Sequence, residues 1–131
     1  LAEIVLTDEL KRNKDGRKAY GEMSRRVMEY VNGLYYLPQK HIYLIGKQAT
    51  IDEGGTMRKR PYFPGQDLNV KVPHMYDEIL HIALTGIAGQ PKPVIAIRTA
   101  ETFDIMARDR SGKLNELEPP DLSALFTKAM S

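Results

Sequence analysis

The feature that most constrains the fold is a run of apolar side chains at helical spacing in the first third of the chain. From Arg17 onward these side chains recur every three or four residues, while Arg25, Arg26 and Glu29 fill the opposite face. This pattern predicts an amphipathic helix that must pack against another element. The apolar positions are Tyr20, Met23, Val27, Tyr30, Val31 and Leu34.

The segments on either side of this helix predict a helix before it and a strand after it. Leu1, Ile4, Val5 and Leu10 have the spacing of one helical face. Residues 11–17 have no apolar side chain and predict an exposed basic loop. After the break at Leu37-Pro38, the run His41–Ile45 is rich in β-branched and aromatic residues, which is typical of a buried strand in a parallel sheet. A helix followed by a buried strand predicts an α/β layer.

Composition limits the classes of protein that remain. The chain has 131 residues, of which 42% are hydrophobic and 27% charged, and this suits one soluble domain over 1–131. It has no cysteine, so a disulfide framework and a thiolate metal site are excluded and a cytoplasmic location is the default. No apolar run approaches the roughly 20 residues of a membrane span. Because the formal charge is only +2, binding to nucleic acid would require a local basic patch.

The second half of the chain predicts a long loop, a hairpin and a final helix. Residues 46–64 contain too many glycines, prolines and charges for a packed element, so we expect a functional or mobile loop. Glu78–Leu84 and Val94–Thr99 predict antiparallel strands whose connection is longer than two residues. Asp121 is placed to cap a helix that buries one apolar face. The positions on that face are Leu122, Leu125, Phe126 and Ala129.

Lys47 and Gln48 follow the expected strand and so fall where open α/β sheets bind their ligands. The amide of Gln48 offers donors and an acceptor that could orient a water or sense a phosphate. A solvated loop glutamine is an equally good interpretation of this spacing.

Arg58, Lys59 and Arg60 are preceded by two glycines and followed by Tyr62 and Phe63. Cations of this kind suit a phosphate backbone, with bases stacked on the neighbouring rings. The alternative is a solvated charged run beside core aromatics, and the residues alone favour that alternative.

Arg108 and Arg110 stand two residues apart in "ARDRSG", so in an extended stretch both side chains lie on one side. Two permanent cations on one side can meet one polyphosphate. The alternative is ordinary pairing with Asp109, Asp104 or Glu101, and the residues alone favour it.

Other kinds of catalytic or metal site find no support in the residues. The histidines His41, His74 and His81 lack metal-ligand spacing and suit structural roles. Asp77 and Glu78 are adjacent, so in a strand they would face opposite ways and not share acid–base work. There is no G-x-S-x-G nucleophile motif and no GxxxxGK[ST] phosphate loop.

Five stretches, taken in order, resemble the C-terminal half of phage-encoded RecA-like ATPases, which are associated with phage recombination and single-strand annealing. They are "KDGRKAYGEMSRRVMEYV", "LPQKHIYLIGKQ", "RPYFPGQ", "VPHMYDEILHIAL" and "ARDRSGKLNELEPPDL". The resemblance implies the C-terminal portion of an α/β RecA-like P-loop NTPase core, with parallel strands, flanking helices and a C-terminal antiparallel hairpin. It also implies that a phosphate loop and an acidic Mg-binding strand precede Leu1, so that ATP and Mg²⁺ are bound mainly by upstream residues.

The resemblance also implies roles for particular residues. Gln48 resembles the glutamine that senses the γ-phosphate and couples it to a DNA-facing loop, here residues 49–60. "ARDRSG" is similar to a Lys-x-Arg-x-Gly stretch whose cations reach the nucleotide of a neighbouring subunit, although Arg108 stands where lysine is more usual. The implied partners are single-stranded DNA and further copies of the chain in a ring or filament, in the cytoplasm of a bacterial host. The residues expected to contact DNA are Lys47, Arg58, Lys59 and Arg60.

Two functions follow as expectations. The first is an ATP-binding, DNA-dependent ATPase of phage recombination or single-strand annealing, in which Gln48, Arg108 and Arg110 complete the nucleotide site and these 131 residues alone do not hydrolyse ATP. The second is a non-catalytic module that binds single-stranded DNA or mediates assembly.

Overall fold

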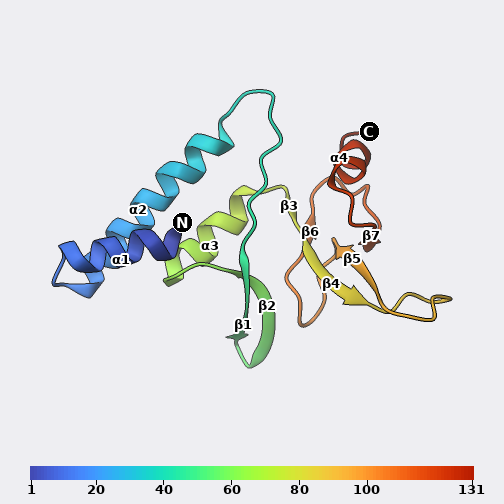
Figure 1. Cartoon of the computed structure of the whole chain (residues 1–131), viewed down its shortest axis with the longest axis horizontal. Helices are drawn as coiled ribbons and strands as arrows, with labels where there is room; N and C mark the ends of the chain where they lie inside the picture. The colour runs from blue at the N-terminus through green and yellow to red at the C-terminus, as the bar shows by residue number, and fades with distance from the viewer. The chain divides into compact units, whose positions relative to one another are not determined.

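The computed structural model describes all residues from 1 to 131, and they form two compact units (Figure 1). Unit 1 comprises Leu1–Gln48 and Pro61–Met75, and unit 2 comprises Ala49–Arg60 and Tyr76–Ser131. Each unit has buried apolar side chains of its own, because the core includes Met23 and Leu68 in the first and Ile97 and Leu125 in the second.

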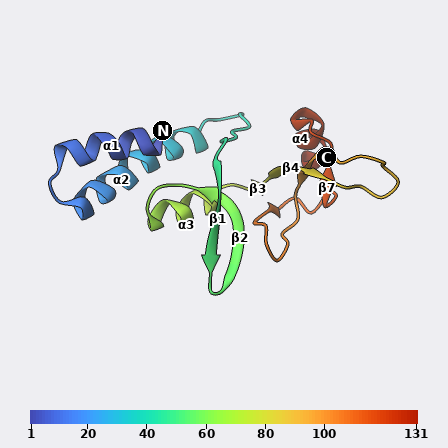
Figure 2. The same cartoon turned by 60° about the horizontal axis from the view of Figure 1, so that its bottom comes forward.

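Unit 1 is built on two helices that run side by side as a hairpin, α1 (Ala2–Arg12) and α2 (Gly16–Tyr35) (Figures 1 and 2). The carboxylate of Asp15 accepts a hydrogen bond of 2.9 Å from the backbone N–H of Arg17. This cap satisfies one of the free N–H groups at the start of α2 and fixes where the helix begins. The predicted long helix is therefore confirmed.

A third helix, α3 (Gln66–Met75), packs on α2. Asn69 holds the chain that leads into it: its side chain accepts from Phe63 N and donates to Phe63 O. Gly65 adopts a φ of +80°, and a Cβ at this position would lie 3.2 Å from Cδ1 of Tyr20. A glycine is therefore needed where the turn before α3 meets α2.

The core of unit 1 uses a narrower face of each helix than the sequence predicts. Val5 of α1 is buried, but Ile4 is 74% exposed, and Tyr20 and Tyr30 of α2 are also exposed. The reason is that α1 packs against a single helix, so only a thin stripe of its surface is covered. The buried apolar residues are Ala2, Val5, Ala19, Met23, Val27, Val31, Leu68 and Val72.

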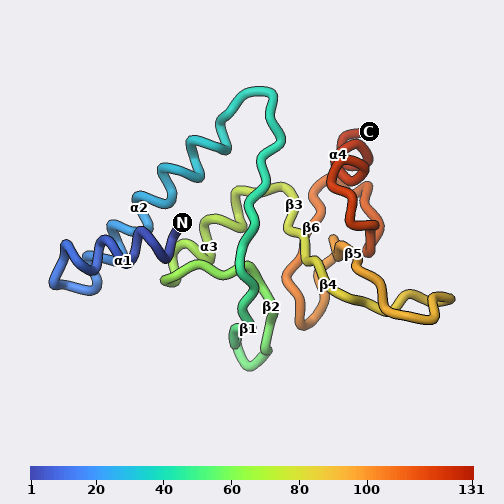
Figure 3. Tube along the Cα trace, viewed as in Figure 1, coloured from blue at the N-terminus to red at the C-terminus, as the bar shows by residue number.

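The strand predicted at His41–Ile45 does not form. The chain from Leu37 to Gly46 has no regular strand or helix and Ile45 is 93% exposed; it is the irregular stretch after α2 in the trace of Figure 3. A strand needs a neighbour to accept and donate its ladder hydrogen bonds. No strand pairs with these residues, so their β-branched side chains have no sheet to join.

The prediction of a long loop at residues 46–64 is also wrong, because most of this segment forms a hairpin. Strands β1 (Lys47–Glu53) and β2 (Thr56–Tyr62) pair with each other and are joined by Gly54 and Gly55. Both glycines have positive φ, +65° and +89°, which is the conformation required by the tight turns that match strand twist. Asp52 closes the turn by accepting from the N–H of Gly55 at 2.7 Å.

Besides most of the β1–β2 hairpin, unit 2 contains two further small antiparallel sheets and a helix. β3 (Glu78–Ile79) pairs with β6 (Arg108–Asp109), and β5 (Val94–Arg98) lies between β4 (His81–Thr85) and β7 (Leu117–Glu118). The predicted hairpin with a long connection is confirmed. The last helix, α4 (Leu122–Met130), is capped by Asp121, whose carboxylate accepts from Ala124 N at 3.0 Å, as predicted.

The predicted α/β RecA-like core with parallel strands is contradicted. The strands form small antiparallel sheets, and the only parallel pairing is an isolated bridge between Lys59 and Ile105. Parallel strands need a crossover of a dozen or more residues between them, usually a helix. Here the strand expected after α2 is missing, and the later strands pair antiparallel as β3 with β6 and as β4, β5 and β7. None of the helices is both long enough and apolar enough to cross a bilayer.

Candidate functional site

The turn between α1 and α2 gathers exposed cations. We call Lys11, Lys14, Arg17 and Lys18 the basic corner; all four are exposed and none takes part in an ion pair. The neighbouring Arg12 is different, because it pairs with Asp8 at 3.2 Å. Three of the four belong to residues 11–17, which were predicted as an exposed basic loop; that prediction is correct only for residues 13–15, because α1 and α2 include the rest.

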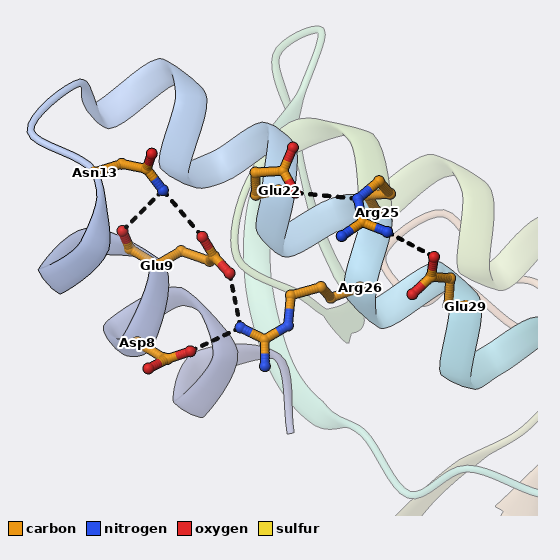
Figure 4. A network of polar contacts seen from close by, with 7 residues as sticks. All are labelled: Asp8, Glu9, Asn13, Glu22, Arg25, Arg26 and Glu29. Carbon is orange, nitrogen blue, oxygen red and sulfur yellow. Dashed lines mark hydrogen bonds and ion pairs between the residues drawn. The ribbon is translucent and has the colours of Figure 1, made fainter.

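Most carboxylates of the helical hairpin form ion pairs outside the corner. Glu9 is nearly buried and pairs with Arg26 at 2.7 Å, while its other oxygen accepts from Asn13 at 3.0 Å (Figure 4). Asp8 pairs with the same guanidinium at 2.8 Å, and this hydrogen bond lowers the pKa of Asp8. Arg26 thus joins two carboxylates of α1 to α2.

The remaining carboxylates of the hairpin are similarly occupied. Arg25 bridges Glu22 at 3.0 Å and Glu29 at 2.6 Å along α2 (Figure 4). Glu3 pairs with Lys47 at 2.7 Å, and Asp15 caps α2. Asp15 is therefore the one carboxylate of the hairpin that lies among the four cations of the basic corner.

The residues expected to contact DNA are mostly engaged in ion pairs. Lys47 binds Glu3. Arg58 lies between Glu53, at 3.6 Å, and Glu101, and Arg60 pairs with Glu53. The side chains of both arginines are largely buried, which matches neither sequence interpretation, since they are neither solvated nor open to a phosphate backbone. Lys59 alone of the four forms no ion pair.

Gln48 is exposed near the start of β1, in unit 1. It lies in a two-stranded hairpin and not at the carboxyl end of a buried parallel strand. Its role as a γ-phosphate sensor stays a prediction.

Arg108 and Arg110 both make contacts within unit 2. The guanidinium of Arg108 donates to the backbone carbonyl of Tyr76, and Arg110 pairs with Asp77 at 3.3 Å. Burial, followed by the charge of Arg110, lowers the pKa of Arg108. Pairing within the chain was the favoured interpretation, but the carboxylate used is Asp77. A contact with a neighbouring subunit's nucleotide stays a prediction for both arginines.

Asp109, between these arginines, organises the turn that follows. One of its oxygens accepts from the N–H and hydroxyl of Ser111 at 2.7 and 2.5 Å, and the other accepts from Leu114 N at 3.0 Å. Burial works to raise the pKa of Asp109, but these hydrogen bonds outweigh it and the pKa lies below its usual value. Asp109 is thus an ionised carboxylate that stabilises the turn after β6.

The pairing of Glu78 with Asp109 was not predicted from the sequence, in which Glu78 was considered only beside Asp77. It stands directly opposite Asp109 in the β3–β6 ladder, and its Oε2 atom is buried and faces no donor. Burial first, and then the charge of Asp109 and the hydrogen bond between the two carboxyls, raise the pKa of Glu78 to about 7. Two facing carboxyls can hydrogen-bond only when one is protonated, so Glu78 holds the proton and Asp109 the charge.

Each unit has an open cavity on its surface. In unit 1 an open cleft of about 770 Å³ is lined by α2 and the start of α3, including Arg25 and Lys71, but both cations are already paired with carboxylates. In unit 2 a hollow of about 370 Å³ beside Arg108 is lined by the carboxylates of Glu101, Asp109 and Glu116, which disfavour a polyphosphate. No three acidic or histidine side chains lie together as metal ligands. The binding of ATP and Mg²⁺ stays a prediction.

Comparison of the chain with models of protein families, with curated proteins and with solved structures finds no match. Function must therefore be argued from the residues of the two units.

Proposed function

We propose that the chain is a non-catalytic module that binds single-stranded DNA. The observation that carries the proposal is the separation of charge on the α1–α2 hairpin. Five of its six carboxylates form ion pairs with cations outside the corner, whereas the four cations of the corner are exposed, form no ion pair and have only Asp15 among them. Such a patch attracts a polyanion even though the net charge of the chain is only +2.

Exposed rings in the same unit support a single strand as the ligand. Of the seven tyrosines of the chain, six lie in unit 1 and all six are exposed. Bases of a single strand are free to stack on such rings, and stacking contributes about 1–3 kcal/mol per base. Paired bases in a duplex are not available in this way. The six are Tyr20, Tyr30, Tyr35, Tyr36, Tyr43 and Tyr62.

The DNA-dependent ATPase remains the alternative, supported by the resemblance of the five sequence stretches and by no contact in either unit. The two proposals differ in a simple measurement. A binding module holds single-stranded DNA with the same affinity with and without ATP and Mg²⁺ and does not release phosphate. An ATPase with an upstream phosphate loop releases phosphate from ATP in the intact polypeptide, faster when DNA is present.

We expect the double variant Lys14→Ala/Lys18→Ala to weaken binding to a dT oligonucleotide about fivefold or more at 0.1 M salt. Each phosphate contact on a single strand contributes about 0.7 to the slope of log affinity against log salt, so the slope should fall by about 1.4. Fluorescence anisotropy at several salt concentrations measures both quantities.

The control is Lys40→Ala/Lys92→Ala, which removes the same charge from exposed positions outside the corner. It should leave the affinity within about twofold, because only screened long-range attraction is lost. If the two double variants weaken binding equally, net charge alone explains the binding and the corner has no specific role. An unchanged affinity in both removes the proposed function.

A further inference from the structure

A second group of cations belongs to unit 2 and comes from three segments far apart in sequence. Lys59 belongs to β2, His81 begins β4 and Arg98 ends β5. We propose that these three side chains form a binding site for a phosphate group. The site is separate from the basic corner, which belongs to unit 1, and it does not depend on the DNA-binding proposal.

The sheet brings two of the three groups together. His81 and Arg98 are directly opposite each other in the antiparallel β4–β5 ladder, so their side chains leave the same face of the sheet. Side chains in this relation have Cβ atoms about 4.5–5.5 Å apart, and like charges placed there are destabilising. Both residues are half-buried, so water screens this repulsion only in part.

Backbone hydrogen bonds fix Lys59 beside the segment that follows β5. Its N–H donates to Asp104 O at 2.8 Å and its carbonyl accepts from Met106 N at 2.9 Å. Burial first, and then the charges of Lys59 and Arg98, lower the pKa of His81, whereas Asp104 acts weakly in the opposite direction. His81 therefore lies within electrostatic reach of both cations.

The carboxylates nearby are already engaged. Glu53 and Glu101 pair with Arg58 and Arg60, and Asp104 accepts a hydrogen bond of 3.1 Å from the Thr102 hydroxyl. Neither Lys59 nor Arg98 enters an ion pair. Unit 2 thus neutralises the two arginines of β2, whereas Lys59 and Arg98 form no ion pair and Asp104 is the carboxylate whose charge acts on the neighbouring His81.

An anion with several acceptor oxygens relieves this repulsion better than a single carboxylate would. The guanidinium of Arg98 offers a planar fork of donors, Lys59 a compact charge, and His81 a ring N–H. Phosphate has enough oxygens to meet all three and carries up to two charges. The phosphate could be inorganic, or it could be the terminal phosphate of a nucleic-acid strand, and the chemistry of recognition is the same.

Phosphate binding should also be linked to protonation. A bound dianion adds negative charge beside His81 and so raises the pKa of its ring, opposing the effects of Lys59 and Arg98. The complex then takes up a proton, and affinity should increase as pH falls through the titration range of His81.

The test follows the ring signals of the three histidines by NMR while inorganic phosphate is added to the full chain. The expected result is a saturable change at His81, with an increase in its pKa, and no comparable change at His41 or His74. Arg98→Gln and Lys59→Gln should each weaken phosphate binding at least fivefold, whereas Arg98→Lys should retain part of it and Lys92→Gln, an exposed control, all of it.

Two comparisons complete the test. Lys14→Ala/Lys18→Ala should leave the phosphate titration unchanged, which separates this site from the basic corner even if DNA binding is not found. A 5′-phosphorylated oligonucleotide that perturbs His81 more than its unphosphorylated equivalent identifies a strand end as the source, and equal effects identify free phosphate. A His81 signal that drifts without saturation, or that responds identically in Arg98→Gln, overturns the proposal.

Discussion

Replacing Leu68 by alanine is expected to lower the free energy of unfolding by about 2–5 kcal/mol, the range for removing a fully buried leucine side chain. Leu68 is completely buried on α3, the helix that packs on α2. Its removal leaves a cavity in a core of only a few side chains. Such a core has little capacity to rearrange and fill the space.

The matched control lies two residues further along the same helix. Val70 is 69% exposed, so Val70→Ala should change the free energy of unfolding by no more than about 0.5 kcal/mol. Both variants retain the charge of the chain and both place alanine in a helix. Chemical denaturation followed by circular dichroism at 222 nm measures the difference. Equal effects of the two substitutions would show that α3 does not pack on α2 in solution.

The elements that were predicted correctly are marked by residues within the element or directly beside it. α2 is marked by apolar side chains at helical spacing, and α4 by Asp121 at its N-cap. The β4–β5 hairpin is marked by two β-branched runs on either side of a segment rich in glycine and proline. In each case the residues that determine the structure lie within one element or its immediate flank.

The elements that sequence analysis missed depend on partners elsewhere in the chain. The run His41–Ile45 has strand composition, but no strand pairs with it. No element was predicted for residues 66–75, which form α3. This helix contains Pro73, and it is stabilised by side-chain hydrogen bonds from Asn69 and by packing on α2. Gly54-Gly55 was a hairpin signal, but the charged residues around it were interpreted as a loop. In these segments tertiary contacts, and not the local sequence propensity, determine the secondary structure.

The same distinction holds for the candidate sites. The basic corner is visible as a run of cations, because its four residues lie close together in sequence, at the end of α1, in the turn and at the start of α2. The group formed by Lys59, His81 and Arg98 depends on the register of β4 and β5 and on the backbone hydrogen bonds that Lys59 forms with residues 104–106. The spacing of these residues in the sequence therefore does not indicate the group. Arg108 and Arg110 were correctly singled out as neighbouring cations, but their contacts with Tyr76 and Asp77 require the β3–β6 pairing.

The β3–β6 pairing also creates the facing carboxyls of Glu78 and Asp109, which makes stability depend on pH. The pKa of Glu78 is about 7 in the folded chain, against 4.5 for an ordinary glutamate, so between these values the folded state holds a proton that the unfolded state releases. Stability from this group is therefore fully present below pH 4.5 and is lost as pH rises through 7. Since Glu78 is partly exposed, solvent screening reduces the effect to about 1–2 kcal/mol.

Glu78→Gln should remove this dependence, because the amide resembles the protonated carboxyl and can donate to Asp109 without carrying a charge. The variant should match the natural chain in stability near pH 5 and exceed it by about 1–2 kcal/mol at pH 8. Denaturation at both pH values measures the difference, and carbon NMR of the Glu78 carboxyl gives its pKa directly. The control Glu116→Gln, at an exposed position of the same unit, should not reproduce the gain at pH 8. A Glu78 pKa near 4.5, or a variant less stable than the natural chain at pH 8, would show that Glu78 and Asp109 do not share a proton.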